Sequence, residues 1–367
     1  MDYITEERKK ITKKRKRRKN ITSIVLLILF FFMTICCLVL LFAYIEEKEK
    51  AEEAWQEKTF LEEQINDGTY ISKNEADALI EEGVTTTSKD QLQIIRSMME
   101  NGDGTLTMLE TLFPEMIVVP DGGKYVFFDI SDTLKKNNYK TENFEFPILN
   151  EETEKYEGEA VYKENGEVTS HKGIDVSKFQ GDINWKKVAK DGVEFAFIRL
   201  GYRGYETGKI VTDDKYEDNI KGCNAAGIDT GVYFFTEAVS EREAIEEAEY
   251  ILENIEGYDI HMPIVIDVEE SASKNSRTKD LTKEERTACV IAFCERIKEA
   301  GYEPMIYGNL KSLMLMLDME QLEEYEKWFA YYRYPVKFPY QYRIWQYTST
   351  GTVDGIDGNA DLNIMFY

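Results

Sequence analysis

Histidine is almost absent from this 367-residue sequence, which contains only His171 and His261. Neither has a second histidine or a cysteine at the spacing of a metal site, such as HxxxH or CxxC. Zinc chemistry and catalytic triads that use histidine as the base are therefore nearly excluded. We expect no bound metal and no cofactor, and any reaction that this chain carries out must use carboxylates.

Cysteine is also scarce. Of the five cysteines, Cys36 and Cys37 lie inside a long apolar run, which leaves Cys223, Cys289 and Cys294 in the rest of the chain. This number and spacing do not form a disulfide framework. We interpret the last three as small core residues.

Positive charge is confined to one end of the sequence. The net charge is −24, but residues 1–20 carry ten Lys or Arg and three acidic residues, while residues 21–367 carry 35 basic and 66 acidic residues. Because so acidic a body repels phosphates, we expect no nucleic-acid partner. The basic arm 1–20 has the alternative interpretation of a nucleic-acid tail. Its position beside an apolar run favours a topology signal that contacts lipid headgroups.

That apolar run extends from Ile24 to Tyr44, 21 residues without a charge. As a helix it is long enough to cross about 30 Å of hydrocarbon. A cleavable signal peptide is the alternative, but its apolar region is normally about 7–15 residues and precedes a small-residue cleavage site. We predict an uncleaved transmembrane helix within residues 21–45 that contacts the lipid bilayer. By the positive-inside rule, the arm lies in the cytoplasm and the acidic remainder lies outside the cell.

The next segments separate this span from the C-terminal part. Residues 46–70 are helix formers with a thin apolar stripe, which predicts a helical stalk capable of weak self-association. Residues 71–150 predict a small α+β module of unknown role, with a β-hairpin between Met116 and Ile130. Residues 151–172 are polar and predict a linker.

From residue 173 to 367, short apolar runs alternate with amphipathic helices, a pattern typical of parallel strands joined by helical crossovers. Helices are expected at 240–256 and 283–300. The expected strands are 173–177, 195–202, 231–235, 263–269, 304–309, 327–332, 343–349 and 361–365. The sequence therefore predicts an α/β fold, a TIM-like β/α barrel that is degenerate, with fewer helices in its last third. An open doubly wound sheet is the alternative, but no GxGxxG loop follows the first strand.

Carboxylates are found at the ends of two of these strands. In β/α barrels the chemistry lies at the carboxyl ends of the strands, which selects Asp175, Asp267 and Glu269. Asp267 and Glu269 are two residues apart on one strand and point to the same face. Their repulsion and an apolar surround raise one pKa and leave the other group ionised, as glycoside hydrolysis requires. The alternative is a structural acidic pair held by an arginine such as Arg199.

Aromatic side chains gather near the same strand ends, where flat rings can stack on sugar faces. Each alone is more typical of a core residue, so only their coincidence with the carboxylates carries weight. The candidate substrate-binding residues are Tyr202, Tyr233, Tyr307, Tyr332, Trp345 and Tyr347.

Five motifs in this order resemble those of the glycosyl hydrolase family 25 lysozymes. They are Gly173-Ile174-Asp175-Val176-Ser177, Asp267-Val268-Glu269, Trp328-Phe329-Ala330-Tyr331-Tyr332, Trp345-Gln346-Tyr347 and Asp361-Leu362-Asn363. The resemblance implies a flattened β/α barrel and cleavage of the β-1,4 bond between N-acetylmuramic acid and N-acetylglucosamine in peptidoglycan, which would be the partner.

By motif position, the resemblance implies that Glu269 is the general acid and Asp267 its carboxylate partner, with Asp175 and Asp361 in the same cleft. One departure is visible, because the family's third strand often ends in Tyr-His-Phe and here it reads Tyr233-Phe234-Phe235. The missing imidazole puts one substrate contact in doubt. A covalent intermediate and attack by the substrate's own acetamido oxygen both remain open.

We therefore expect a bacterial muramidase, tethered to the outer face of the cell membrane. A second hypothesis is a catalytically silent wall-binding or assembly protein, and the retention of all four acidic positions argues against it. A third is a hydrolase of another N-acetylglucosamine polymer such as chitin, which fits a membrane-anchored domain poorly.

Overall fold

The computed structural model describes residues 89–150, 155–271 and 273–366. The predicted basic arm, transmembrane helix and stalk, residues 1–70, lie outside these ranges. Within the described part of the chain, no helix is long and apolar enough to cross a membrane.

The N-terminal module begins with two helices, α3 (Lys89–Asn101) and α4 (Thr105–Leu112). A hairpin follows, in which β1 (Met116–Asp121) pairs antiparallel with β2 (Lys124–Asp129), as the sequence predicts. Its turn consists of two glycines, 122 and 123, with φ of 57° and 79°. Two consecutive residues in the left-handed region match the twist of the paired strands, which explains the glycines.

The segment predicted as a linker, 151–172, contains short β-strands in the part that the structure describes. Strand β6 (Val161–Glu164) pairs with β3 (Phe144–Glu145), which follows the short helix η1 (Thr141–Asn143), and with β7 (Glu167–Val168). Two further short strands pair with each other, β4 (Ile148–Asn150) and β5 (Lys155–Glu157). Residues 155–172, which the sequence analysis predicts as a polar linker, thus contain short paired strands and the start of β8.

The physical reason is a small number of apolar side chains that the polar composition hides. Ala160 and Tyr162 are almost fully buried. The ring of Tyr162 packs edge-on against Phe366 at 5.6 Å, and its hydroxyl accepts from Asn143 Nδ2 at 3.2 Å. Two well-placed side chains thus fix a segment that composition alone predicts to be unstructured.

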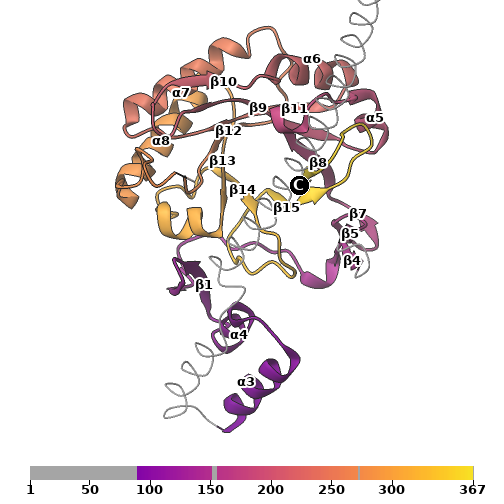
Figure 1. The fold of residues 1–367 in the computed structure, drawn as a ribbon, viewed down its shortest axis with the longest axis vertical. Coiled ribbons are helices and arrows are strands. Elements are labelled where there is room, and N and C mark those ends of the chain that lie inside the picture. Colours follow the sequence, from indigo (N-terminus) through magenta and orange to yellow (C-terminus); the bar gives the residue numbers. More distant parts are fainter. Residues whose placement is uncertain (1–88, 151–154, 272, 367) are drawn as a thin grey trace, which may run out of the picture. The chain divides into compact units, whose positions relative to one another are not determined.

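Residues 171–366 form a closed barrel of eight strands with one additional edge strand (Figure 1). Seven neighbouring strands run parallel, and the last, β16, runs antiparallel to both β15 and β8. The barrel strands are β8 (His171–Val176), β9 (Phe195–Arg203), β11 (Asp229–Phe235), β12 (Ile264–Asp267), β13 (Pro304–Asn309), β14 (Glu326–Ala330), β15 (Ile344–Gly351) and β16 (Ala360–Met365). Closure through the β8–β9 pairing excludes the open doubly wound sheet.

The crossover helices lie outside the strands and become fewer along the chain (Figure 1). They are η2 (Lys178–Gln180), α5 (Trp185–Lys190), α6 (Tyr216–Ala226), α7 (Glu241–Asn254), α8 (Lys283–Glu299) and the π-helical turn η3 (Ser312–Met316). The described residues after β14 contain no α-helix, as predicted for the last third. The antiparallel edge strand β10 (Ile210–Thr212), which pairs with β9, is an element that the sequence analysis does not predict.

The ends of α8 show how the sequence sets a helix boundary. The Thr282 hydroxyl accepts from the Glu285 amide at 3.2 Å, and the Glu285 carboxylate accepts from the Thr282 amide at 2.9 Å. This reciprocal capping box satisfies donors that an isolated helix leaves unpaired. Gly301, with φ of 87°, turns the chain away at the other end.

Large side chains fill the interior of the barrel. Phe197 of β9 and Trp328 of β14, which are on opposite sides of the eight-strand ring, stack at 4.6 Å between ring centroids. The inward cluster comprises Phe195, Phe197, Met262, Val265, Met305, Tyr307, Trp328, Ala330, Ile344 and Met365. Because the interior is packed solid, a substrate can be bound only at an end of the barrel.

Candidate active site

Four acidic side chains belong to the end of the barrel where the parallel strands finish. Asp175 is at the end of β8, Asp267 is the last residue of β12, and Glu269 follows two positions later. Asp361 lies on the antiparallel strand β16, where it is directly paired with Asp175. The barrel thus brings together residues that are up to 186 positions apart in the sequence.

Asp175 is 7% exposed and is held by two amide side chains. Gln346 Nε2 and Asn363 Nδ2 both donate to Asp175 Oδ2 at 2.8 Å. Asn363 is itself fixed by Trp328, whose indole N–H donates to Asn363 Oδ1 at 2.7 Å. The carboxylate therefore has a defined orientation, because each donor that contacts it is also oriented by a neighbour.

Two tyrosine hydroxyls complete this network from the other side. Tyr307 and Tyr332 both donate to Gln346 Oε1, at 2.8 and 2.6 Å. With its oxygen accepting from two hydroxyls, the Gln346 amide presents its N–H group to Asp175. We call Asp175, Gln346, Asn363, Tyr307 and Tyr332 the Asp175 network.

Burial raises the pKa of three of these acidic groups, and neighbouring carboxylates raise two of them further. Burial raises the pKa of Asp175 to about 6, against the opposing effect of its bonds from Asn363 and Gln346. Burial, together with the charges of Asp175 and Glu269, raises the pKa of Asp361 well above its usual value. Closely spaced buried carboxyl groups do not all ionise together near neutral pH, so this site retains protons.

Asp267 is a buried carboxyl group close to two others. It is 5% exposed, and its Oδ1 has no hydrogen-bond partner among the described residues. Burial and the charges of Glu269 and Asp175 raise the pKa of Asp267 well above its usual value. A buried carboxyl oxygen without a partner is costly for folding and is typical of a functional site.

Arg199 does not hold the acidic pair, as the alternative interpretation of that pair would require. Its guanidinium binds Asp213, with Nη2 at 2.6 Å and Nε at 2.8 Å from Oδ2. The positive charge of Arg199 lowers the pKa of Asp267 only from a distance. Phe179 and Tyr202 cover this arginine, with ring centroids 5.0 and 5.8 Å from its Cζ.

The candidate aromatic residues separate into two groups. Tyr233, Tyr307 and Tyr332 lie in the site, since their pKa values are raised by burial and additionally by the charges of its carboxylates. Tyr332 is 45% exposed, although its hydroxyl donates to the buried Gln346. Tyr202 lies beside Arg199 at the same end of the barrel.

Trp345 and Tyr347 are not in the site. They are 0% and 1% exposed and belong to the apolar layer outside the barrel. Since Gln346 points inward to Asp175, its two neighbours on β15 must point outward. The prediction that Trp345 and Tyr347 bind substrate is therefore not supported by their positions, and only the residue between them, Gln346, reaches the carboxylates.

The alternation of side chains also shows where Phe234 lies, the residue that stands where the family often has histidine. This side chain is 0% exposed and packs in the outer layer, with its ring 6.5 Å from Tyr250. Tyr233 and Phe234 face opposite sides of β11, and only Tyr233 lies beside the carboxylates. The side chain at position 234 therefore lies in the outer layer of the barrel, away from the carboxylates.

Sequence reasoning missed the functional placement of Gln346, Asn363 and Trp328, although each lies within a quoted motif. The available signal was the polar residue at every second position of two otherwise apolar strands, Gln346 and Thr348 in β15 and Asp361 and Asn363 in β16. Phe179, 76% exposed next to Arg199, was also missed. Within the described residues, no group of three or more His, Cys, Asp and Glu side chains is arranged to hold a metal ion.

Comparison with known proteins agrees with this geometry. The family model described as "Glycosyl hydrolases family 25" matches residues 174–356. The protein YegX of Escherichia coli strain K12 is 32% identical over 201 residues, which are 53% of this chain and 68% of YegX. The autolytic lysozyme of Clostridium acetobutylicum is 27% identical over 202 residues, covering 52% of this chain and 55% of that protein.

Among solved structures, the modular autolysin LytC from Streptococcus pneumoniae, in complex with a synthetic peptidoglycan ligand, shares the fold. The match has a TM-score of 0.50 and 23% identity, and it covers 68% of this chain and 67% of that chain. The closed eight-strand barrel, the acidic residues at its end and the family match together lead to one conclusion: this chain belongs to glycosyl hydrolases family 25.

Proposed function

We propose that this chain is a muramidase that hydrolyses the β-1,4 bond between N-acetylmuramic acid and N-acetylglucosamine in bacterial peptidoglycan. The observation that carries the proposal is the set of four carboxylates at the barrel end, in a chain of this family. The relatives support the substrate class, because one is named an autolytic lysozyme and another was solved with a peptidoglycan ligand.

Glu269 is the proposed general acid. It is half-buried, and its charge raises the pKa of Asp267 and Asp361, so it lies near both. In the reaction, the Glu269 carboxyl gives its proton to the bridging oxygen as the glycosidic bond breaks. A water molecule then adds to the anomeric carbon, and its proton returns to Glu269.

Asp267 is proposed to stabilise the positive charge that develops at the anomeric carbon or on an acetamido group that attacks it. Its Oδ1 is buried and has no hydrogen-bond partner among the described residues, which supports a functional role for this carboxylate. The charges of Glu269 and Asp175 influence how readily Asp267 ionises, since both raise its pKa in addition to burial. Both the covalent and the acetamido-assisted route use this arrangement.

Tyr332 is the proposed stacking platform. Its exposed ring and fixed hydroxyl suit the flat face of a sugar, since the ring needs no further ordering when a glycan binds. Phe179, stacked on Arg199, provides a second exposed ring at this end of the barrel.

We also propose that the chain is anchored in the bacterial cell membrane by residues 24–44, with the barrel outside the cell. The uncharged 21-residue run and the ten basic residues before it support this topology. Such tethering would restrict hydrolysis to wall that lies near the membrane.

The test compares two adjacent glutamates in the full-length chain. Glu269→Gln removes the proposed proton donor, whereas Glu270→Gln changes an exposed carboxylate that binds Lys311 at 2.7 Å. Release of reducing sugar from purified peptidoglycan is measured for both. We expect the first variant to lose at least about 100-fold in kcat and the second to stay near the unsubstituted chain.

A full-length chain that releases no sugar from several wall types would reject the muramidase and favour a silent wall-binding protein. Release from chitin in place of peptidoglycan would favour a hydrolase of another N-acetylglucosamine polymer. Equal loss in both glutamate variants would reject Glu269 as the specific acid.

A further inference from the structure

The β14–β15 connection, residues 331–343, is held by the N-terminal module at both of its ends. Near its start, α4 contributes Glu110 and Thr107, which bind Arg333. Near its end, residues 131–139 bind residues 338–342, with Asn137 Nδ2 donating to Phe338 O at 2.7 Å and Tyr139 hydroxyl donating to Tyr342 O at 2.8 Å. The module is therefore attached to a connection that begins at the catalytic end of the barrel, after β14, and crosses to the opposite end, where β15 starts.

The first of these attachments is a two-point ion pair. Arg333 Nη1 donates to Glu110 Oε1 at 3.0 Å and Arg333 Nη2 donates to Glu110 Oε2 at 3.2 Å, while Nη2 also donates to Thr107 Oγ1 at 3.0 Å. The Glu110 side chain is only 8% exposed. A forked pair with a buried carboxylate fixes both the position and the direction of the arginine.

Glu110 also reaches the residue on the other side of Tyr332. The Tyr331 hydroxyl donates to Glu110 Oε1 at 3.5 Å, and Arg333 Nη1 lies 3.4 Å from the same hydroxyl. The Tyr331 amide donates to Gln346 O at 3.0 Å. Both neighbours of Tyr332 are thus held by one carboxylate of α4.

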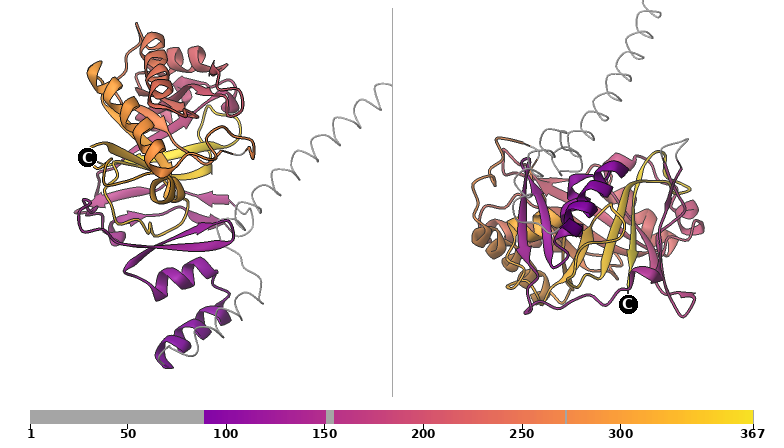
Figure 2. Two further views of the ribbon diagram at one scale, coloured as in Figure 1. Left: turned by 90° about the vertical axis from the view of Figure 1, so that its left-hand side faces the viewer. Right: turned by 90° about the horizontal axis from the view of Figure 1, so that it is seen from below.

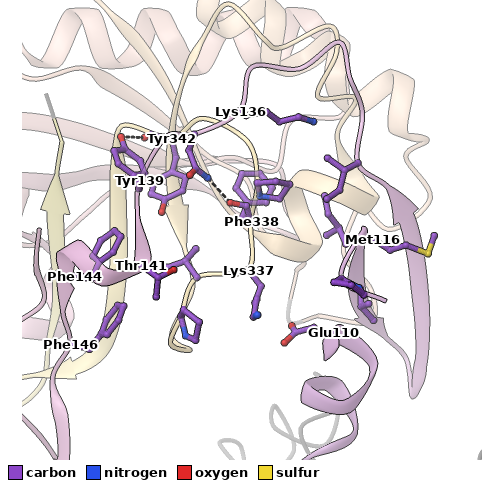
Figure 3. A pocket seen from close by; sticks show the side chains of 18 residues that line it. Glu110, Met116, Lys136, Tyr139, Thr141, Phe144, Phe146, Lys337, Phe338 and Tyr342 are labelled. Carbon is purple, nitrogen blue, oxygen red and sulfur yellow. Dashed lines mark hydrogen bonds between the residues drawn. The ribbon is translucent and has the colours of Figure 1, made fainter. Parts of the chain in front are cut away.

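Packing supplies only part of this restraint from the module side, where Phe146 stacks on Tyr334 at 4.9 Å between ring centroids. A pocket of about 480 Å³ lies between the two attachments, lined by Glu110, by Phe144 and Phe146 of the module and by residues 335–339 of the connection. Figure 3 shows Glu110 at the edge of this pocket, away from the aromatic rings that line its other side. Removing the ion pair therefore leaves an open space that neighbouring side chains do not fill.

We propose that Glu110 is a positioning residue for the active site, which it controls through the Arg333 ion pair and Tyr332. The consequence follows from the Asp175 network: Tyr332 donates to Gln346, and Gln346 donates to Asp175. The module, for which the sequence assigns no role, then serves to hold the sugar platform of the barrel. This inference rests on the proposed glycan hydrolysis.

The experiment uses the full-length chain and the variants Glu110→Gln, Arg333→Lys and Glu100→Gln. Glu110→Gln removes the charge, and Arg333→Lys keeps the charge but loses the fork. Glu100→Gln is the matched control, because it breaks an exposed ion pair with Arg96 on α3 of the same module, at 2.9 Å. Thermal unfolding of each variant shows whether it is folded.

Two readouts separate positioning from mere stability. The first is hydrogen exchange of residues 331–334, which we expect to quicken in Glu110→Gln and Arg333→Lys and to stay unchanged in Glu100→Gln. The second is hydrolysis of soluble glycan strands, for which we expect the Glu110→Gln KM to rise about fivefold to tenfold with little change in kcat. In the double variant with Glu110→Gln and Tyr332→Phe, the fold-loss in kcat/KM should be smaller than the product of the fold-losses in the two single variants.

The inference would be overturned if hydrogen exchange of residues 331–334 is unchanged in Glu110→Gln. It would also be overturned if the fold-loss in kcat/KM of the double variant equals the product of those of Glu110→Gln and Tyr332→Phe. If the unsubstituted chain hydrolyses no glycan, the proposed function fails. In that case the exchange comparison still decides whether Glu110 fixes the Tyr332 segment.

Discussion

At the scale of single residues, the pKa of Asp175 makes a prediction about stability. In the folded chain this pKa is raised to about 6 from an ordinary value of 3.8. Between these two pH values the unfolded chain has lost the proton that the folded chain keeps, so this group's contribution to the free energy of unfolding falls as pH rises. We expect Asp175→Asn to show a flatter decline than the unsubstituted chain in urea unfolding between pH 4 and 6.5. An identical pH dependence in both chains would contradict this.

The same substitution predicts a change in the activity profile. The charge of Asp175 raises the pKa of Asp267, so an uncharged asparagine lowers it. The acid limb of the kcat/KM profile, which we assign to ionisation of Asp267, should move to lower pH. A limb that stays in place would show that Asp175 does not influence the group that titrates.

Two tyrosines provide a matched test of the aromatic assignments. Tyr332→Phe removes the donor to Gln346 and should lower kcat/KM about tenfold, the effect of one buried hydrogen bond. Tyr347→Phe changes a residue in the outer core and should alter kcat/KM less than about twofold. Steady-state kinetics on the same glycan measure kcat/KM for both variants. A larger loss in Tyr347→Phe than in Tyr332→Phe would restore Tyr347 as a substrate contact.

The carboxylates were predictable from the sequence because their location depends only on strand ends and on the alternation of side chains. Asp175, Asp267 and Glu269 follow apolar runs, and buried charge of this kind is rare without a function. The amide groups that hold Asp175 were not predictable in this way. Gln346 contacts Asp175 across 171 residues of sequence, and only the closed barrel reveals that contact.

At the scale of secondary-structure elements, Gly173 makes a prediction about packing of β8 against β9. A Cβ atom at position 173 would overlap the ring of Phe195, which is 1% exposed inside the barrel. Because that ring is enclosed, Gly173→Ala should reduce the free energy of unfolding by about 1–3 kcal/mol. Urea unfolding measures this, and an unchanged midpoint would mean that the ring has room to move.

The barrel strands were predictable to within a few residues because each is a continuous apolar run between polar segments. Strand β13, for example, has the predicted bounds Pro304–Asn309. The short strands of residues 144–168 were not, because they are two to four residues long and depend on single buried rings such as Tyr162. Figure 2 shows these strands against the module side of the barrel, where long-range packing stabilises them.

At the scale of the whole molecule, the proposed topology predicts how the full-length chain fractionates. With residues 24–44 in the bilayer, it should stay in the membrane pellet after alkaline carbonate extraction. Protease added to intact protoplasts should digest the barrel. Release of the chain by carbonate would contradict a membrane span, and a protected barrel would contradict the orientation.

The central claim is that this chain cleaves the bond after N-acetylmuramic acid, and the identity of the new reducing end tests it most directly. Purified peptidoglycan is digested with the full-length chain, the products are reduced with borohydride, and their masses are determined. The account predicts muramitol at the new ends, in products that are absent when Glu269→Gln replaces the unsubstituted chain. Reduced N-acetylglucosamine at those ends, or products that persist with Glu269→Gln, would contradict it.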